Sequence, residues 1–286
     1  MPGRCVSVRD YLQGLSSRVP ADQKLRCWIE EVFLRHQGRY GRARLEVELR
    51  EAGWIVSGKR ITRLLQELGL RPRQSRPPRP KRAKGASLHP VLAANLLNRN
   101  FAPSVVQGPN RVWCSDITYL PTHQGWLYLA VVMDLYSRRI IGWSMQEHLT
   151  QQLVNDALQM AFRQRVISSG SSGVLHHSDQ GCQYTSHTYQ KLLRDQGMQC
   201  SLSRRGNCHD NAPVESFFAT LKKELLHRGG HFDAFLCRDS ARRQVFEFIE
   251  IYYNRLRRHS TLGYISPSQF EANSPNGRYT TNQELN

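Results

Sequence analysis

Residues 111–145 read RVWCSDITYLPTHQGWLYLAVVMDLYSRRIIGWSM. Three segments of this stretch are rich in β-branched and aromatic residues and are separated by short polar turns, which predicts three antiparallel strands. Helical and strand patterns alternate after them, so the predicted order is βββαβαβα. This order indicates an α/β fold with a mixed sheet and helices on its faces. The expected strands are 111–120, 126–136, 138–145, 174–177 and 198–203, and the expected helices are 149–164, 186–196 and 212–227.

Three acidic residues occupy special places in this pattern. Asp116 lies inside the first strand, Asp179 follows the fourth strand, and Glu215 lies in the first turn of the last helix, with 35 residues between Asp179 and Glu215. A carboxylate in a central strand is costly to bury unless it meets a cation or a donor. Three carboxylates that converge on one sheet edge raise each other's pKa unless a metal is present. Oxygen ligands of this kind suit Mg²⁺ or Mn²⁺.

The composition points to a polyanionic partner. The chain has 286 residues, with 40 Lys and Arg against 23 Asp and Glu, a net charge of +17. An excess of this size is not typical of a neutral metabolic enzyme and favours nucleic acid as the partner. A membrane partner is not expected, because the longest apolar run, LYLAVVM at 127–133, is far shorter than the roughly 20 residues that cross a bilayer.

The cysteine pattern indicates a reducing compartment. The seven cysteines are scattered singly, and no two of them form a C-x2-C pair. A disulfide scaffold is therefore not expected, and an intracellular location fits best.

The positive charge is concentrated in the N-terminal part. Residues 1–90 hold 20 Lys and Arg against 8 Asp and Glu. Three short helices are predicted here, at 22–37, 42–52 and 58–68, and Ser57 is expected to cap the third. Helices with tight turns and a cationic last helix resemble a helix-turn-helix DNA reader at 20–70, although any small three-helix bundle shows the same pattern. The predicted DNA contacts are Lys59, Arg60 and Arg63.

A basic linker is predicted at 71–104, before the α/β core at 105–228. Its first part, RPRQSRPPRPKRAKG at 71–85, contains four prolines and almost no aliphatic residues, so it cannot pack a core. It is either a solvated spacer or an arm on DNA phosphates, and its charge favours the arm. A C-terminal extension at 229–272 is expected to contain one long helix over 233–253. Its basic cluster, which includes Arg257 and Arg258, would pack on the core or touch DNA.

Four motifs identify the chain as similar to a known family. They are the acids with their 35-residue spacing, HSDQGCQY (177–184), GNCHDNAPVESFFATLKKELLH (206–227) and YYNRLRRHSTLGYISPSQFE (252–271). Together they resemble the second-frame (orfB-type) product of bacterial insertion sequences of the IS-three family. Members of this family are DDE transposases with an RNase H-like, retroviral-integrase-like core. The resemblance runs from about residue 20 to residue 271.

The resemblance implies a function and a set of partners. Asp116, Asp179 and Glu215 would be the catalytic, metal-binding triad, which holds two Mg²⁺ or Mn²⁺ ions for DNA cleavage and strand transfer. The partners would be the DNA of element ends and target, in a homo-oligomeric assembly, in the bacterial cytoplasm at the nucleoid. Family members usually act as a frameshift fusion with an upstream product, so such a fusion or partner is expected. The His/His/Cys/Cys zinc module of retroviral integrases has no match here.

Other polar residues have two interpretations each. Lys222 lies seven residues after Glu215, on the same helical face, and is either a phosphate ligand or a solvated lysine; Arg204 and Arg205 have the same standing. Asp134 is either a fourth metal ligand or the start of a turn, and the turn is favoured. Asp210 and Asn211 are expected to cap the Glu215 helix. His176 and His177 either assist the metal site or pack in the interior.

The sequence leaves two alternative functions open. One is a non-catalytic DNA-binding relic or repressor, against which the presence of all three acids argues. The other is an RNase H-type nuclease, against which the basic N-terminal module and the YNRLRRHSTLGY tail (253–264) argue.

Overall fold

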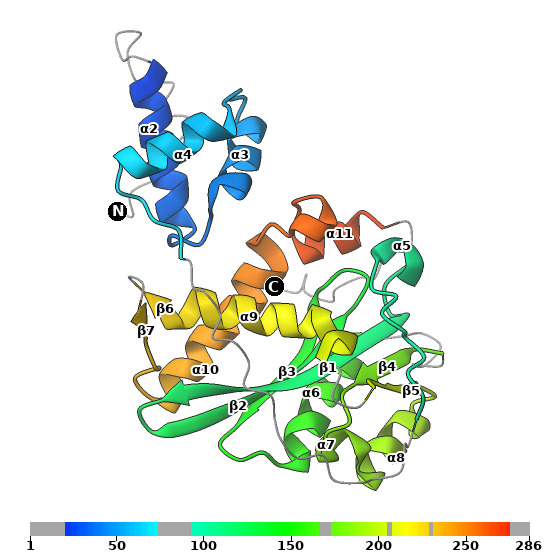
Figure 1. The fold of residues 1–286 in the computed structure, drawn as a ribbon. Helices are drawn as coiled ribbons and strands as arrows, with labels where there is room; N and C mark the ends of the chain where they lie inside the picture. The colour runs from blue at the N-terminus through cyan, green and yellow to red at the C-terminus, as the bar shows by residue number, and fades with distance from the viewer. Residues whose placement is uncertain (1–20, 74–92, 166–172, 205–207, 229–230, 275–286) are drawn as a thin grey trace, which may run out of the picture. The chain divides into compact units, whose positions relative to one another are not determined.

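A computed structural model describes residues 21–73, 93–165, 173–204, 208–228 and 231–274 (Figure 1). The chain divides into two compact units. One comprises residues 1–76 with 227–231, and the other comprises residues 77–226 with 232–286. None of the helices in the described ranges is both long and apolar enough to cross a membrane.

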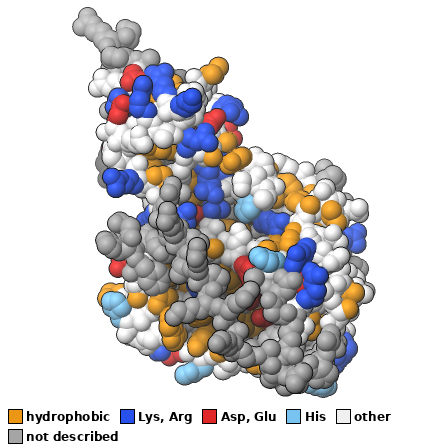
Figure 2. Space-filling model, in the orientation of Figure 1, with side chains coloured by type: hydrophobic (Ala, Val, Ile, Leu, Met, Phe, Trp, Pro, Cys, Tyr) orange, Lys and Arg blue, Asp and Glu red, His pale blue; other side chains and the backbone are white. Residues whose placement is uncertain are grey.

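The N-terminal unit contains the three expected helices, α2 (Ala21–Arg35), α3 (Arg42–Glu51) and α4 (Gly58–Glu67). The Ser57 side chain accepts a hydrogen bond from the Arg60 backbone N–H, which confirms the predicted cap of α4. Apolar residues at helical spacing, such as Ile29, Leu45 and Leu64, are buried between the helices. Lys and Arg side chains are prominent on this unit (Figure 2).

A five-stranded mixed sheet forms the second unit. Strands β1 (Val112–Thr122), β2 (Gly125–Asp134) and β3 (Ile140–Gln146) are antiparallel neighbours. Strands β4 (Leu175–Ser178) and β5 (Gln199–Leu202) run parallel to β1, and the order across the sheet is β3-β2-β1-β4-β5. The predicted mixed sheet is therefore confirmed.

Helices cover both faces of this sheet. Helix α6 (Gln151–Gln164) packs over β2 and β3, and its buried residues share one cluster with Ala130 and Val132. Leu129 and Val131 are also fully buried, and by the two-residue period of a strand they point to the other face. Helix α9 (Ala212–Leu226) packs against β1. The remaining elements between β3 and α9 are α7 (Cys182–Thr185), α8 (His187–Asp195) and the 3₁₀ turn η1 (Cys208–Asn211).

The predicted single C-terminal helix is wrong in both its start and its type. A short hairpin, β6 (His227–Arg228) and β7 (His231–Phe232), precedes helix α10 (Arg238–Phe246). Phe235 donates its backbone N–H to Pro121 O at 3.0 Å, so the chain joins the end of β1 before the helix begins. The helix then continues as a π-helix, η2 (Glu247–Leu256), followed by η3 (Ser260–Leu262) and α11 (Pro267–Ala272). The Tyr253 ring on η2 lies 4.7 Å from the Phe217 ring, so the tail packs back on α9.

The expected linker is only partly a separate segment. Residues 74–92 lie outside the described residues, while α5 (Pro103–Val106) and the turns before it belong to the second unit. The backbone N–H of Leu96 donates to Ser201 Oγ at 3.0 Å, and Leu97 is buried. The C-terminal third of the predicted 71–104 linker is therefore anchored on the core.

Close approach of α6 to β3 requires glycine at position 142. A Cβ atom there would lie 2.2 Å from Ala157 O and 2.7 Å from Ala161 N, both of which are backbone atoms. We expect Gly142→Ala to lower the free energy of unfolding by about 1–3 kcal/mol, because helix and strand must move apart. Urea denaturation would measure this loss, with Ser144→Ala in the same strand as the control. Equal stability of the two variants would contradict this packing.

Candidate active site

The pairing of β1 with β4 places Asp116 beside Asp179. The last pair of this parallel ladder joins Cys114 to His177, and each acid lies two residues beyond it. Neighbouring strands are about 4.8 Å apart, so equal steps along both strands leave the two acids side by side. Asp116 and Asp179 line the same cavity, which has a volume of about 190 Å³. Asp116 and Asp179 thus lie together at the point where the two strands separate.

Helix α9 carries Glu215 in its first turn, and a network anchors the segment before it. Asn211 donates its side-chain N–H to Ser115 O at 3.0 Å, directly beside Asp116 in the chain. The fully buried Asp210 accepts hydrogen bonds from Arg204, Arg99 and Asn95 at 2.7–2.9 Å. The Arg204 side chain is the main reason why the pKa of Asp210 lies well below its usual range. These bonds therefore fix the start of α9, the helix that carries Glu215.

The expected capping role of Asp210 and Asn211 is not what the structure shows. Both side chains bond across the fold, to residues that are distant in sequence. Within the described residues, Asn211 Oδ1 is buried without a hydrogen-bond partner. These two residues act by positioning the start of α9, a role that no local pattern reveals.

Burial and the charges of the other two acids affect the ionisation of Asp116. Burial raises the pKa of Asp116 from 3.8 to about 8, and the charges of Asp179 and Glu215 contribute to this rise, while Lys222 opposes it. Burial also raises the pKa of Asp179 and that of Glu215. A bound cation would relieve the repulsion at Asp116.

The donor set fits a hard divalent cation. Among the described residues, no group of three or more His, Cys, Asp and Glu side chains surrounds a single point closely enough to hold an ion. Asp116 and Asp179 nevertheless share a cavity, and Glu215 is near enough for its charge to raise the pKa of Asp116. Carboxylate oxygens beside an open cavity suit Mg²⁺ or Mn²⁺ rather than zinc.

Lys222 is half-buried and lies close to Tyr119, so it is not a freely solvated lysine. Its Nζ lies 4.4 Å from the centre of the Tyr119 ring. Burial lowers the pKa of Lys222, and the Asp116 charge opposes this shift. A lysine held between an aromatic ring and the acids is placed to meet an anionic group that enters the cavity.

The two histidines belong to the interior. His176 Nε2 lies 2.9 Å from Ser115 Oγ and 3.0 Å from the Tyr189 hydroxyl, and His177 Nδ1 lies 2.9 Å from Ser201 Oγ. Burial lowers the pKa of His176 to about 3 and that of His177 to about 4. Their role is therefore neutral packing and hydrogen bonding. They stabilise the β4 strand that leads to Asp179.

Asp134 has the turn role that its sequence predicts. It is fully buried, and its carboxylate accepts hydrogen bonds from the backbone N–H groups of Tyr136, Ser137 and Asn110. It closes the β2–β3 turn and is not among the residues that line the acid cavity.

The predicted DNA-contact residues have different surroundings. Lys59, Arg60 and Arg63 are exposed on α4. Arg204 is exposed but bonded to Asp210, Arg258 donates to Tyr264 O at 3.0 Å, and Arg205 lies outside the described residues. Arg257 is buried and donates two hydrogen bonds of 3.0 Å to Glu224. Its guanidinium stabilises the fold at that point and offers no surface to phosphate.

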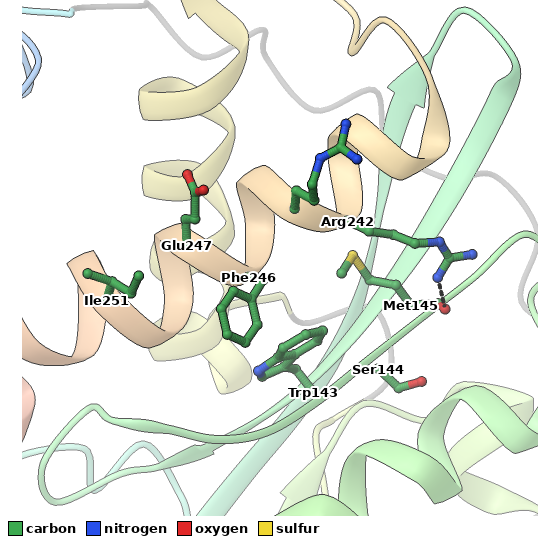
Figure 3. A pocket seen from close by; sticks show the side chains of 8 residues that line it. Trp143, Ser144, Met145, Arg242, Phe246, Glu247 and Ile251 are labelled. Atoms are coloured by element: carbon green, nitrogen blue, oxygen red, sulfur yellow. Dashed lines mark hydrogen bonds between the residues drawn. The ribbon is translucent and has the colours of Figure 1, made fainter.

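A larger cavity, of about 650 Å³, lies between β3 and the helices α10 and η2 (Figure 3). Trp143 and Phe246 line it, and Arg242 Nη1 donates to Met145 O at 2.7 Å. None of its described lining residues is one of the three acids. The candidate active site is therefore the smaller, acidic cavity.

The raised pKa of Asp116 predicts a pH-dependent stability. The folded state holds a proton up to about pH 8, whereas an unfolded chain releases it near 3.8, so the unfolding free energy falls as pH rises through this window. In EDTA at pH 9 we expect Asp116→Asn to be more stable than wild type by on the order of 1–3 kcal/mol. The difference should vanish near pH 4. Denaturation at both pH values checks this, with the exposed Asp239→Asn as the control. A difference that is equal at both pH values would refute it.

Comparison with protein families matches both units. An integrase core domain model matches residues 106–208, a second integrase core domain model matches residues 196–267, and an HTH-like domain model matches residues 20–78. Among solved structures, the HTLV-2 integrase catalytic core domain covers 57% of this chain and 97% of its own, with 18% identity and a TM-score of 0.42. A simian T-cell lymphotropic virus intasome chain covers 86% of this chain and 78% of its own, with 15% identity and a TM-score of 0.45.

Curated relatives are more similar. The transposase InsF for insertion sequence IS3A of Escherichia coli K12 is 45% identical over 259 residues, 89% of this chain and 86% of its own. A 31 kDa protein of insertion element IS600 from Shigella sonnei is 44% identical and covers 89% of both chains. The transposase of IS904 from Lactococcus lactis is 43% identical and covers 85% of this chain and 91% of its own. The chain therefore belongs to the IS-three (IS3) family of insertion-sequence transposases, and it is an RNase H-like DDE polynucleotidyl transferase that acts in DNA transposition.

Proposed function

We propose that Asp116, Asp179 and Glu215 are the catalytic triad that cleaves DNA at the ends of an insertion sequence and transfers the 3′ end to a target. One observation carries this proposal. The β1–β4 register sets Asp116 and Asp179 side by side on one cavity, and the Glu215 charge reaches the same point. Carboxylates that would destabilise a metal-free interior are neutralised when cations bind them, and the proposed site works in that form.

The charge balance favours two divalent ions in the active site. Three carboxylates and one scissile phosphate carry about four negative charges, which two Mg²⁺ or Mn²⁺ ions neutralise. Asp116, Asp179 and Glu215 would hold the ions, and both Asp179 and Glu215 act on the pKa of Asp116. When bound, the ions supply activation of the attacking oxygen and stabilisation of the leaving oxygen.

The residues around the acids direct an in-line substitution at phosphorus. The oxygen of water attacks the scissile phosphate, the P–O3′ bond breaks, and a free 3′-hydroxyl and a 5′-phosphate result. That hydroxyl then attacks a target phosphodiester, so one P–O bond forms as another breaks and no covalent protein–DNA intermediate is needed. Lys222 lies where it would bind the phosphate, and Asn211 and Asp210 keep Glu215 in place.

The N-terminal unit is the proposed DNA reader at residues 20–70. The α4 helix exposes Lys59, Arg60 and Arg63 on one side and buries Ile61, Leu64 and Leu65 on the other. Such a helix binds phosphates and groove edges with its cationic side. Arg204, Arg205 and Arg258 remain proposed contacts of the second unit, whereas Arg257 is not among them.

The proposed setting is the bacterial cytoplasm, at the nucleoid. The substrates are the element ends and target DNA, bound by a homo-oligomeric assembly in which each end meets one active site. A product of the upstream frame, fused or separate, would contribute further end recognition. The net charge of +17 supports binding to long DNA.

Removal of one triad carboxylate should abolish the chemistry and preserve binding. We expect Glu215→Gln to lower divalent-dependent cleavage of element-end DNA by at least about 10³-fold, because a metal ligand is lost while the shape is kept. A cleavage assay with Mg²⁺ or Mn²⁺ measures this loss, and anisotropy checks that DNA binding is unchanged. The exposed Glu247→Gln is the control. Equal cleavage by Glu215→Gln and wild type would reject the triad, and cleavage of RNA–DNA hybrids alone would favour an RNase H-type nuclease.

Charge removal on α4 should weaken DNA binding in a salt-dependent way. Each of Lys59→Ala and Arg63→Ala should reduce the slope of log affinity against log salt by about 1, because fewer counterions are released. Fluorescence anisotropy at several salt concentrations measures this slope. Arg50→Ala on α3, which is also exposed, is the comparison variant. If all three variants lose affinity equally, general charge and not the α4 face binds DNA.

A further inference from the structure

An exposed aromatic pair lies at the hairpin of β1 and β2. Tyr119 is 55% exposed and Trp126 is 50% exposed, although both are large side chains in a central hairpin of the sheet. Pro121 pairs with Trp126, and Tyr119 with Tyr128, so Tyr119 and Trp126 are diagonal neighbours on one face. Their ring centroids are 5.0 Å apart, and the planes meet at 80°. The pair is thus an ordered feature and not two scattered surface residues.

This face of the sheet changes character along its length. Near its middle, Ala130 and Val132 are buried under α6, and Ile117 packs against the same cluster. Two residues beyond Ile117, Tyr119 is exposed, and Leu149 beside the start of α6 is 46% exposed. The apolar surface therefore continues past the core into solvent. A continuous exposed apolar surface marks a binding site more often than single exposed residues do.

One ring of the aromatic pair, Tyr119, borders the proposed active site. Tyr119, Tyr128 and Leu149 line the same 190 Å³ cavity as Asp116 and Asp179. Lys222 lies over one face of the Tyr119 ring, at 4.4 Å, and links the pair to the acids. The arrangement combines a cation, metal-binding acids and aromatic rings in one place. A nucleotide presents the matching groups, a phosphate and a flat base.

The size of the cavity limits what can enter it. A volume of about 190 Å³ has no room for a base pair, so the base next to a phosphate beside Asp116 lies outside the cavity. Bases that leave the duplex stack on aromatic side chains, and this stacking tolerates every base because each has a π-face. Tyr119 lines this cavity, and its exposed neighbour Trp126 extends the aromatic surface beyond the lining residues.

We propose, on the basis of the function proposed above, that Tyr119 and Trp126 form a platform on which an unpaired base next to the scissile phosphate stacks. Lys222 holds Tyr119 in place from one side and binds the adjacent phosphate. The platform is a positioning site for an opened DNA end and supplies no catalytic group. It binds an unstacked nucleotide whatever its base.

The test couples a protein change to a DNA change. The full chain with Glu215→Gln, which separates binding from cleavage, is titrated with a short duplex that carries an unpaired oligothymidine 3′ end. A second duplex has an abasic site in place of the first unpaired base. We expect Trp126→Ala and the abasic site each to weaken binding about 10-fold, and the two together to weaken it no further. Trp126→Phe should retain most of the affinity.

Two controls separate base stacking from general aromatic contact and from self-association. Phe246→Ala removes an aromatic side chain of similar exposure that borders the larger cavity, and it should leave the abasic effect unchanged. Additive losses from Trp126→Ala and the abasic site would overturn the proposal. The proposal would also be overturned if Trp126→Ala changed the oligomeric state, measured by light scattering, and showed no coupling to the abasic site. That result would assign the pair to contact with a second copy of the chain. Tyr119→Leu, measured in the same cycle, covers the case in which Trp126→Ala does not fold.

The platform and the triad can fail separately. If Glu215→Gln cleaves DNA normally while the base coupling is present, the triad assignment is wrong and the platform stands. If Glu215→Gln is inactive and the coupling is absent, the platform is wrong and the triad stands.

Discussion

The parallel pairing of β1 with β4 is the constraint on which the site depends. It ends at Cys114 and His177, and the strands then separate, so the next inward positions on both strands face an open cavity. Asp116 and Asp179 occupy these positions. Burial and their repulsion raise the pKa of Asp116 to about 8, and the sheet tolerates this because its backbone bonds and the packing on its faces hold the strands in register. The fold thus maintains an electrostatically unfavourable pair that favours cation binding.

A second layer of polar contacts sets the position of the third acid. Asp210 joins Arg204 to Arg99 and Asn95, and Asn211 joins the start of α9 to β1. Segments that are distant in sequence therefore meet directly before Glu215. The same network explains why residues 95–99, which resemble a linker in sequence, are part of the core. An arginine that looks suited to DNA, Arg204, has this internal role as well.

The surroundings of the acids suggest how the protein handles one strand of DNA. The cavity is small, Tyr119 and Leu149 are among its lining residues, and Lys222 connects ring and carboxylates. The N-terminal unit presents its cations on α4, on a separate compact body. In the proposed function, recognition of duplex DNA and handling of the reacting strand therefore belong to different parts of the chain.

The sequence by itself determined the strand and helix order, the α4 face, the Ser57 cap and the candidate acids, because these follow from local periodicity and from motif spacing. It did not determine side-chain partners that arise from the folding of distant segments. Arg257 resembles part of a basic surface cluster, yet its partner Glu224 lies 33 residues earlier and the pair is buried. The sequence around Asp210 predicts a helix cap, but Asp210 bonds to Arg99 instead. Residues 233–235 are predicted to be helical, but Phe235 bonds to Pro121 at the end of β1. Only the tertiary structure decided these points, because burial and pairing depend on which segments meet in space. The same holds for the position of the aromatic pair beside the acids.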